Sequence, residues 1–262
     1  MSSFFPIFFQ FLFYLSAGTS LFLPLVNSQL TGAAHSKLIA MISCLLSFIA
    51  CLGLGVAKID LTIFSSTTLL HSLLWAVIWN RHQDKRTLEI YLYYVLSIVA
   101  SFVFIHQSAM NWSIQLYIIN SVLILGLINY IMILGHYYLV VPRLTVRPLI
   151  LGLKIYWVLV FLKIVFLAPF HDVLNFWSDF IALFMGQSQM LGPSRDMAEL
   201  TLIFFQQLSF FIANPILSYL GYRLCLIRST QSATGIFYVM VFFALISEML
   251  SLYFLMTKGL RF

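Results

Sequence analysis

The chain has 262 residues, of which 62% are hydrophobic and only 8% are charged. Soluble domains carry about 25% charged and about 45–50% apolar residues, so this chain has too few charges to cover a water-exposed surface. The composition therefore excludes a soluble enzyme, a secreted disulfide scaffold, a disordered chain and a nucleic-acid-binding domain. It predicts an all-α, polytopic integral membrane protein. The net charge is +6, and the charged residues are scattered between apolar stretches. This distribution is typical of the loops of a membrane protein rather than of a nucleic-acid-binding surface.

Eight stretches are long and apolar enough to cross a bilayer, which takes about 20 mostly apolar residues. In chain order they are residues 4–26, 38–57, 61–79, 88–106, 113–140, 148–170, 199–224 and 234–257. Turn-forming or charged residues separate them, among them Gly32 after the first stretch, the charged run 81–86 after the third and Pro142 after the fifth. The first stretch has no positively charged start and is longer than the core of a signal peptide, so we interpret it as a membrane helix. We expect the whole chain, 1–262, to form one transmembrane bundle.

Residues 172–185 form a shorter amphipathic segment between the sixth and seventh spans. Val173, Phe176 and Phe180 recur at helical spacing, and acidic residues lie on the opposite side. This pattern predicts a helix that lies in the membrane interface, with Trp177 at the depth of the lipid headgroups. Such a helix is either an ordinary connector or a docking surface or lid over an outer cavity.

The lysines and arginines near the span ends predict the orientation of the chain. Those in loops after odd-numbered spans are Lys37, Arg81, Lys85, Arg86, Arg143, Arg147, Arg223 and Arg228, and those on the other side are Lys58, Arg195, Lys258 and Arg261. Because positive charge collects on the inner side, we expect both termini on the outer or periplasmic side.

Lys163 and Glu248 are the intramembrane charges that helix geometry brings to one depth. At 1.5 Å of rise per residue, Lys163 lies about 22 Å from the inner end of its span and Glu248 about 21–24 Å from the inner end of its own. Gln206 and Gln207 reach a similar level from the outer side. Pairing the two charges would lower the cost of burying both. These four residues form a candidate proton or ion-pair site, in which Glu248 titrates, or else the two charges form a purely structural pair.

A second candidate site lies at the inner end of the fifth span, where His136, Tyr137, Tyr138 and Arg143 follow one another closely. Hydrogen-bonding and aromatic groups of this kind suit a quinone or a lipid headgroup. The same residues are also typical of an aromatic belt beside a positively charged flank.

His71, Asn214 and Ser218 are candidates for lining a cavity. His71 lies near mid-depth, but His136 lies roughly 19 Å further inward, so a haem held by two histidines of this chain is not predicted. A haem that His71 shares with a ligand from another subunit stays open. His71 otherwise serves as a hydrogen-bonding link between helices. Asn214 and Ser218 share a face of the seventh span, which Pro215 interrupts. Such a break is a transporter feature when it lines a cavity, and a routine kink otherwise.

Several enzyme classes are not indicated. The chain has no HExxH, GxSxG or P-loop motif, too few acidic residues for a carboxylate metal cluster, and no CxxC pair among its three cysteines. We therefore expect no catalytic residues, no metal and no intrinsic cofactor. A quinone or haem is a minor alternative.

The function that these observations favour is that of an integral, non-catalytic subunit of a larger membrane complex. The spans are rich in phenylalanine, with 26 in the chain, and helices that are apolar all round face lipid or other membrane subunits. We expect a respiratory or otherwise energy-transducing complex of a bacterial or organellar inner membrane, with bound lipids and other subunits as partners. The first alternative is a proton-coupled small-molecule transporter that uses Glu248 and Lys163, and the second is a quinone- or haem-handling enzyme that uses His71 or His136.

Overall fold

The structure is a computed structural model that describes residues 4–26, 28–56, 64–81, 88–108, 111–141, 145–167 and 197–259, together with Trp177, Ser178, Ile181 and Met185. Its helices are α1 (Phe4–Leu21), α2 (Ser28–Val56), α3 (Phe64–Arg81), α4 (Leu88–Ser108), α5 (Trp112–Val140), α6 (Arg147–Leu162), α8 (Met197–Gln207), α9 (Asn214–Leu226) and α10 (Thr230–Lys258). Three short segments adjoin them: the 3-10 turn η1 (Leu23–Leu25) and the π-helices η2 (Lys163–Leu167) and η4 (Leu208–Ala213). No strand occurs in these ranges, and the all-α fold is confirmed.

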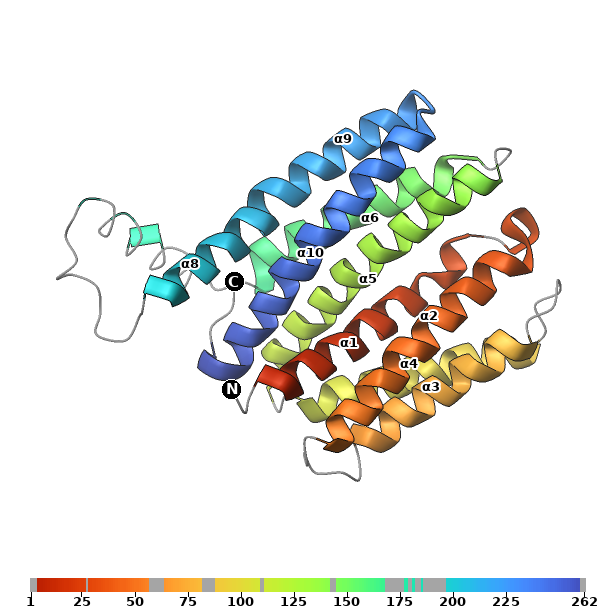
Figure 1. The fold of residues 1–262 in the computed structure, drawn as a ribbon, viewed down its shortest axis with the longest axis horizontal. Helices are drawn as coiled ribbons and strands as arrows, with labels where there is room; N and C mark the ends of the chain where they lie inside the picture. The colour runs from red at the N-terminus through yellow and green to blue at the C-terminus, as the bar shows by residue number, and fades with distance from the viewer. Residues whose placement is uncertain are drawn as a thin grey trace.

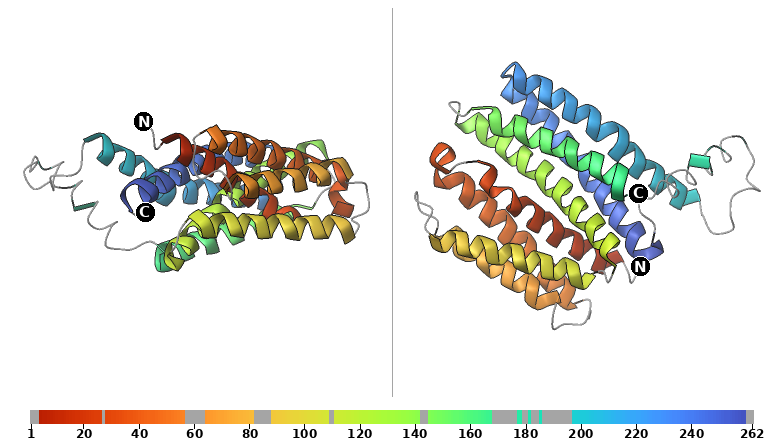
Figure 2. Two further views of the ribbon diagram at one scale, coloured as in Figure 1. Left: turned by 90° about the horizontal axis from the view of Figure 1, so that it is seen from below. Right: turned by 180° about the vertical axis from the view of Figure 1, so that it is seen from behind.

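The helices form a bundle whose central member is α5 (Figure 1). Helix α5 lies between α1 and α10 and also contacts α6, whereas α2, α3 and α4 continue the bundle beyond α1, and α9 lies against α10. The two other views show the same helices running side by side along one common direction (Figure 2). In the most apolar stretch of α5, 78% of the residues are buried, against 28% in that of α4. Helix α5 is therefore enclosed by protein, and α4 lies at an edge.

Helices α1 and α5 approach each other most closely at two glycines. A Cβ atom on Gly126 would lie 2.0 Å from the carbonyl carbon of Gly18, and one on Gly18 would lie 2.2 Å from the carbonyl oxygen of Val122. Beside this crossing, Asn129 Nδ2 donates a hydrogen bond to Thr19 Oγ1 at 2.8 Å. Small residues and interhelical hydrogen bonds of this kind hold helices together in lipid, where burying apolar surface provides no driving force.

The polarity of the helices is inverted relative to a soluble protein. In α3, Thr68 and His71 are fully buried, whereas Leu70 is 49% and Leu73 56% exposed. Helix α4 likewise buries serines and exposes large aliphatic side chains. A soluble monomer rarely exposes a large continuous apolar surface, so this arrangement supports a membrane location.

Seven helices of the described part of the chain are long and apolar enough to cross a membrane: Phe4–Leu25, Ala34–Val56, Tyr91–Ser108, Trp112–Val140, Arg147–Val165, Ala198–Leu226 and Thr230–Lys258. They correspond to seven of the eight predicted spans. The remaining predicted span, 61–79, forms α3, which packs along α2 and α4. Helix α3 has only 18 described residues, and His71, Asn80 and Arg81 among them lower its mean hydropathy more than the hydroxyl residues 65–68 do.

Some helices begin earlier than the predicted membrane spans. Helix α2 begins at Ser28 rather than at residue 38 and runs through Gly32, because one glycine costs only about 1 kcal/mol in a helix and good helix formers flank it. Helix α10 begins at Thr230 rather than at residue 234, since the turn from α9 is short and is made by Arg228 in a left-handed conformation with φ 58°. The predicted interfacial segment, 172–185, lies largely outside the described residues. Within it, Trp177 and Ile181 are helical and exposed.

Candidate functional site

Lys163 and Glu248 form a buried ion pair that joins η2 to α10. Lys163 Nζ lies 2.7 Å from Glu248 Oε2 and 2.9 Å from Oε1, so the ammonium group contacts both carboxylate oxygens. The exposed fractions of the two side chains are 0% and 2%. The depth argument from the sequence placed these residues at one level, and the structure has them in contact. Lys154, nine residues earlier on α6 and about 180° round the helix from Lys163, is exposed.

Residues of α5 and η4 complete the surroundings of the ammonium group. Lys163 Nζ donates to Ser121 Oγ at 3.0 Å and lies 4.9 Å from the ring centre of Tyr117 and 4.7 Å from that of Phe210. The faces of aromatic rings attract cations, most strongly where water is excluded. The hydroxyl of Tyr117 is in turn hydrogen-bonded to Ser251 of α10. We call Lys163, Glu248, Ser121, Tyr117 and Phe210 the charged cluster.

Two π-helical segments lie at the charged cluster. Segment η2 begins at Lys163 itself, and η4 contains Phe210, which packs over the ammonium group. After η4, Pro215 lacks an N–H group, so the carbonyl of Phe211 has no normal helical partner. π-Helical turns are rare and occur frequently at functional sites. Ser121, Tyr117 and Phe210 were not predicted, and only Pro215 signals either segment in the sequence.

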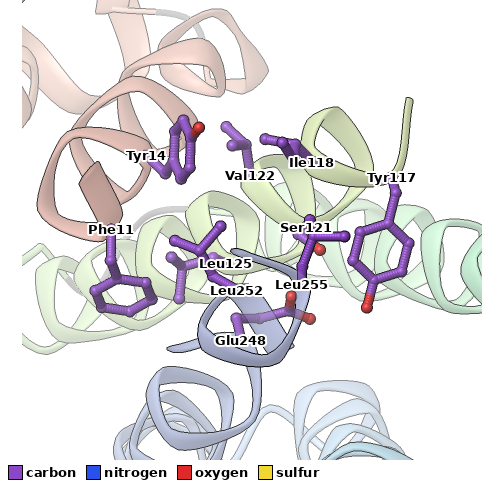
Figure 3. Close-up of a pocket in the computed structure, with 10 residues that line it drawn as sticks. All are labelled: Phe11, Tyr14, Tyr117, Ile118, Ser121, Val122, Leu125, Glu248, Leu252 and Leu255. Carbon is purple, nitrogen blue, oxygen red and sulfur yellow. The ribbon is translucent and has the colours of Figure 1, made fainter. Parts of the chain in front are cut away.

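A small cavity borders Glu248 between α1, α5 and α10 (Figure 3). Its volume is about 20 Å³, which is enough for a single water molecule. The oxygen atoms of Glu248, Ser121 and Tyr117 lie toward one another at one side of it (Figure 3). Its lining consists of Phe11, Tyr14, Tyr117, Ile118, Ser121, Val122, Leu125, Glu248, Leu252 and Leu255. The carboxyl group therefore lies beside space for water in an otherwise apolar setting.

Gln206 and Gln207 lie at the end of α8, next to η4. Both are buried, with exposed fractions of 0% and 1%, and none of their amide nitrogen or oxygen atoms has a hydrogen-bond partner. They therefore make no hydrogen bond to Lys163 or Glu248. A buried amide left without a partner costs about 1–3 kcal/mol, so this part of the bundle has unused capacity to bind water or a polar ligand.

Asn214 and Ser218 lie on the buried face of α9. With its amide nitrogen placed as donor, Asn214 bonds the carbonyl of Met240 at 2.9 Å, and its oxygen accepts from the N–H of Ala244 at 3.3 Å. Asn214 thus ties α9 to the backbone of α10 rather than lining an open cavity. Ser218 is fully buried, and its hydroxyl has no partner.

His71 lies at the centre of the α1–α3 side of the bundle. Trp75 Nε1 donates to His71 Nε2 at 3.2 Å, and the ring of Phe13 packs edge-on at 5.2 Å between ring centres. No group of three or more His, Cys, Asp or Glu side chains that could hold a metal ion occurs among the residues that the structure describes. This hydrogen bond lies within α3, so the contact of His71 with another helix is the ring packing against Phe13 of α1 and not the predicted hydrogen bond between helices.

The candidate residues at the end of α5 point in three directions. His136 Nδ1 is hydrogen-bonded to the exposed Tyr238 Oη at 3.1 Å, and the ring of Tyr137 packs against His35 at 5.3 Å. Tyr138 is buried and donates to the carbonyl of Thr145. Consecutive helix residues are turned by about 100°, so these three do not gather around one ligand position. Arg143 lies outside the described residues.

No family model, no curated protein and no solved structure matches this chain.

Proposed function

We propose that the protein is an integral membrane subunit of a larger energy-transducing complex, and that it lends the Lys163–Glu248 pair to a proton path. The observation that supports this is the burial of a complete ion pair inside an apolar bundle. Apolar residues of similar size often fill such a position at no loss of stability, so an ion pair is not needed for packing. Ionisable residues in the membrane interior are rare and recur in proton relays.

In this proposal Glu248 is the group that takes up and releases the proton. The ionised carboxylate contacts the ammonium group of Lys163 through both of its oxygens, and protonation of Glu248 removes that ionic contact. The ammonium group then keeps Ser121 and the rings of Tyr117 and Phe210 as partners. Besides Lys163, the ionisable groups near the carboxylate within the described part of the chain include Tyr117 and Tyr14, which share its cavity, and Tyr156 of α6, which lies within electrostatic range.

The exterior of the bundle supports the role of a subunit. Large aromatic side chains on separate helices are half exposed or more, among them Phe102 at 51%, Phe161 at 60% and Phe242 at 60%. Surfaces of this kind suit contact with other membrane proteins and with lipid chains. The partners in this proposal are therefore other membrane subunits and bound lipids, in an energy-transducing membrane.

The test combines native sizing with one charge-neutralising variant. After gentle solubilisation from its own membrane, the protein should comigrate with other subunits. The Glu248→Gln variant should assemble normally with its partner subunits, but membrane vesicles that carry it should show no proton movement. The Glu199→Gln variant should assemble and keep proton movement. Glu199 is a matched control because it also pairs with a lysine, Lys258 at 3.5 Å, but at the bundle surface. Normal proton movement with Glu248→Gln would contradict the proposal.

A second candidate function is proton-coupled transport of a small molecule. The specific support is the continuous α8–η4–α9 helix, which is π-helical at η4 and contains Pro215 and the unpartnered amides of Gln206 and Gln207. Irregular helices that present polar groups form the binding sites of many transporters. Migration as a lone monomer or homodimer, with uptake driven by a pH gradient and abolished by Glu248→Gln, would favour this function over the first.

A further inference from the structure

We propose that water and protons reach Glu248 along the seam between α1 and α10, from the end of the bundle at which α1 begins and α10 ends. We call this end the terminal end. The function of this route rests on the proposed role of Glu248 in proton transfer. Whether the route exists depends only on how α1 and α10 pack. It assigns an entrance to Gln10 and Thr257 and an inner chamber to the cavity beside Glu248.

Two hollows follow each other along this seam. The outer one has a volume of about 510 Å³, opens to the outside and is lined by Pro6, Ile7, Gln10, Met256 and Thr257. The inner one is the cavity beside Glu248, which the next turns of the same two helices line. Helices α1 and α10 run in opposite directions, so residues early in α1 meet residues late in α10 at each level (Figure 1). The hollows therefore lie in series.

The distances along the helices make this route short. Thr257 and Glu248 are nine residues apart on α10, a rise of about 14 Å. Gln10 and Tyr14 are one turn apart on α1, a rise of about 6 Å. Phe11 and Leu255 line the inner cavity, and their chain neighbours Gln10 and Met256 line the outer hollow. The barrier between them is thus about one helical turn of apolar side chains.

The entrance carries a polar group that lacks a partner. Gln10 Oε1 is buried and has no hydrogen-bond partner, and Gln10 lines the outer hollow. Buried polar atoms without a protein partner in native structures are commonly bonded to water. A water chain that enters beside Thr257 would satisfy this oxygen on its way to the inner cavity.

The route from the opposite end of α10 is longer and filled. From Thr230 to Glu248 the helix rises about 27 Å. Phe237 and Met240, on this stretch, are fully buried, and Ala244 is 1% exposed. Phe237 also fills the space beside Gly135 and Gly221. Access from the terminal end is therefore the shorter path.

The experiment measures which residues water reaches. Cys44, Cys51 and Cys225 are replaced by alanine, and single cysteines are introduced at Thr257, Gln10, Leu255 and Leu96. Sealed vesicles of each orientation are treated with a membrane-impermeant, cationic methanethiosulfonate reagent. Because thiols react as thiolates, which form in water and not in lipid, the reaction rate reports hydration.

We expect Thr257→Cys and Gln10→Cys to react rapidly from the terminal end. Leu255→Cys should react from the same side at a lower but measurable rate. Leu96→Cys is the control, since its side chain is 42% exposed on the apolar exterior and should not react. Adding Ile7→Trp, which narrows the outer hollow that Thr257 also lines, should slow Leu255→Cys several-fold more than it slows Thr257→Cys.

Reaction of Leu255→Cys from the opposite side, or no reaction while Gln10→Cys reacts, would overturn the route. The labelling pattern does not depend on proton movement, so the two proposals fail separately. Labelling as expected, together with full proton movement in Glu248→Gln, would support the water route and contradict the proposed function. Loss of proton movement in Glu248→Gln, together with labelling of Leu255→Cys from the end opposite the terminal end, would support the proposed function and contradict the route.

Discussion

Two regions of this bundle bury polar side chains, and they differ in where the hydrogen-bond partners of those side chains lie. The charged cluster joins η2, α5, η4 and α10, and its hydrogen bonds link residues 42 and 85 positions apart in the chain. The other region, which we call the hydroxyl cluster, comprises Ser43, Ser47, Thr68, His71 and Ser72 on α2 and α3. There, Ser47 bonds the carbonyl of Ser43 at 2.6 Å and Thr68 that of Phe64 at 3.0 Å, both within their own helices, and only the 3.3 Å bond from Ser72 to the carbonyl of Cys44 joins α3 to α2 among these three.

The difference lies in what each kind of group requires. A hydroxyl on a helix is satisfied by the carbonyl one turn back, so it imposes little on the neighbouring helix. A buried charge has no such local partner and must be met by a charge and by hydrogen bonds from elsewhere. Helices α2 and α3 accordingly remain regular, whereas π-helical segments lie beside Lys163. We infer that chemistry is concentrated in the charged cluster and that the hydroxyl cluster holds helices together.

The largest effect on stability is expected from breaking the ion pair on one side. Lys163→Met should lower the free energy of unfolding by about 3–5 kcal/mol, because it leaves Glu248 buried without its partner. The measurement is unfolding in mixed micelles by titration with dodecyl sulfate. Lys154→Met is the control, since Lys154 lies on the same helix but is exposed, and it should change little. Equal stability of the two variants would contradict the assigned role of the pair.

A smaller effect is expected at the α1–α5 crossing, which separates the two clusters. Gly126→Ala places a methyl group 2.0 Å from the backbone of Gly18, and overpacking of this kind costs about 1–3 kcal/mol. In Gly235→Ala nothing lies within 4 Å of the new atom, so the helix should be unchanged or gain up to about 1 kcal/mol. The same unfolding titration measures both, and a neutral Gly126→Ala would show that this crossing is looser than described.

The smallest effect is expected in the hydroxyl cluster. His71→Phe keeps an aromatic ring against Phe13 but removes the acceptor of the Trp75 hydrogen bond within α3, and a hydrogen bond of this kind contributes about 0.5–1.5 kcal/mol net. Proton movement should be unchanged. If His71→Phe abolished it, the division of labour between the two clusters would not hold.

Much of the fold could be predicted from the sequence because bilayer thickness and apolar length are directly linked. Seven predicted spans correspond to helices of the necessary length and apolarity. Boundaries were harder, since a residue such as Gly32 breaks a helix in one context and lies inside a helix in another. Which face of α3 is buried was also hard to predict, because a run of hydroxyl residues such as 65–68 occurs both in loops and in buried helices.

For the candidate site, depth along a helix could be predicted but direction around it only in part. The rise per residue brought Lys163 and Glu248 to one level, and they are in contact. The same argument placed Gln206 and Gln207 nearby, yet neither bonds to the pair. A π-helical turn inserts an extra residue and shifts the facing of all that follow, and no residue pattern announces it at Lys163. The partners Tyr117, Ser121 and Phe210 therefore could not be named in advance.

The most direct test of the central claim is proton movement by the double variant Lys163→Met, Glu248→Leu. This variant replaces the pair by apolar side chains of similar size, so it should be at least as stable as the native protein. If the pair handles protons, membrane vesicles that carry the variant will contain the assembled protein and show no proton movement above background. Native proton movement by the assembled double variant would contradict the claim and leave the pair a structural element.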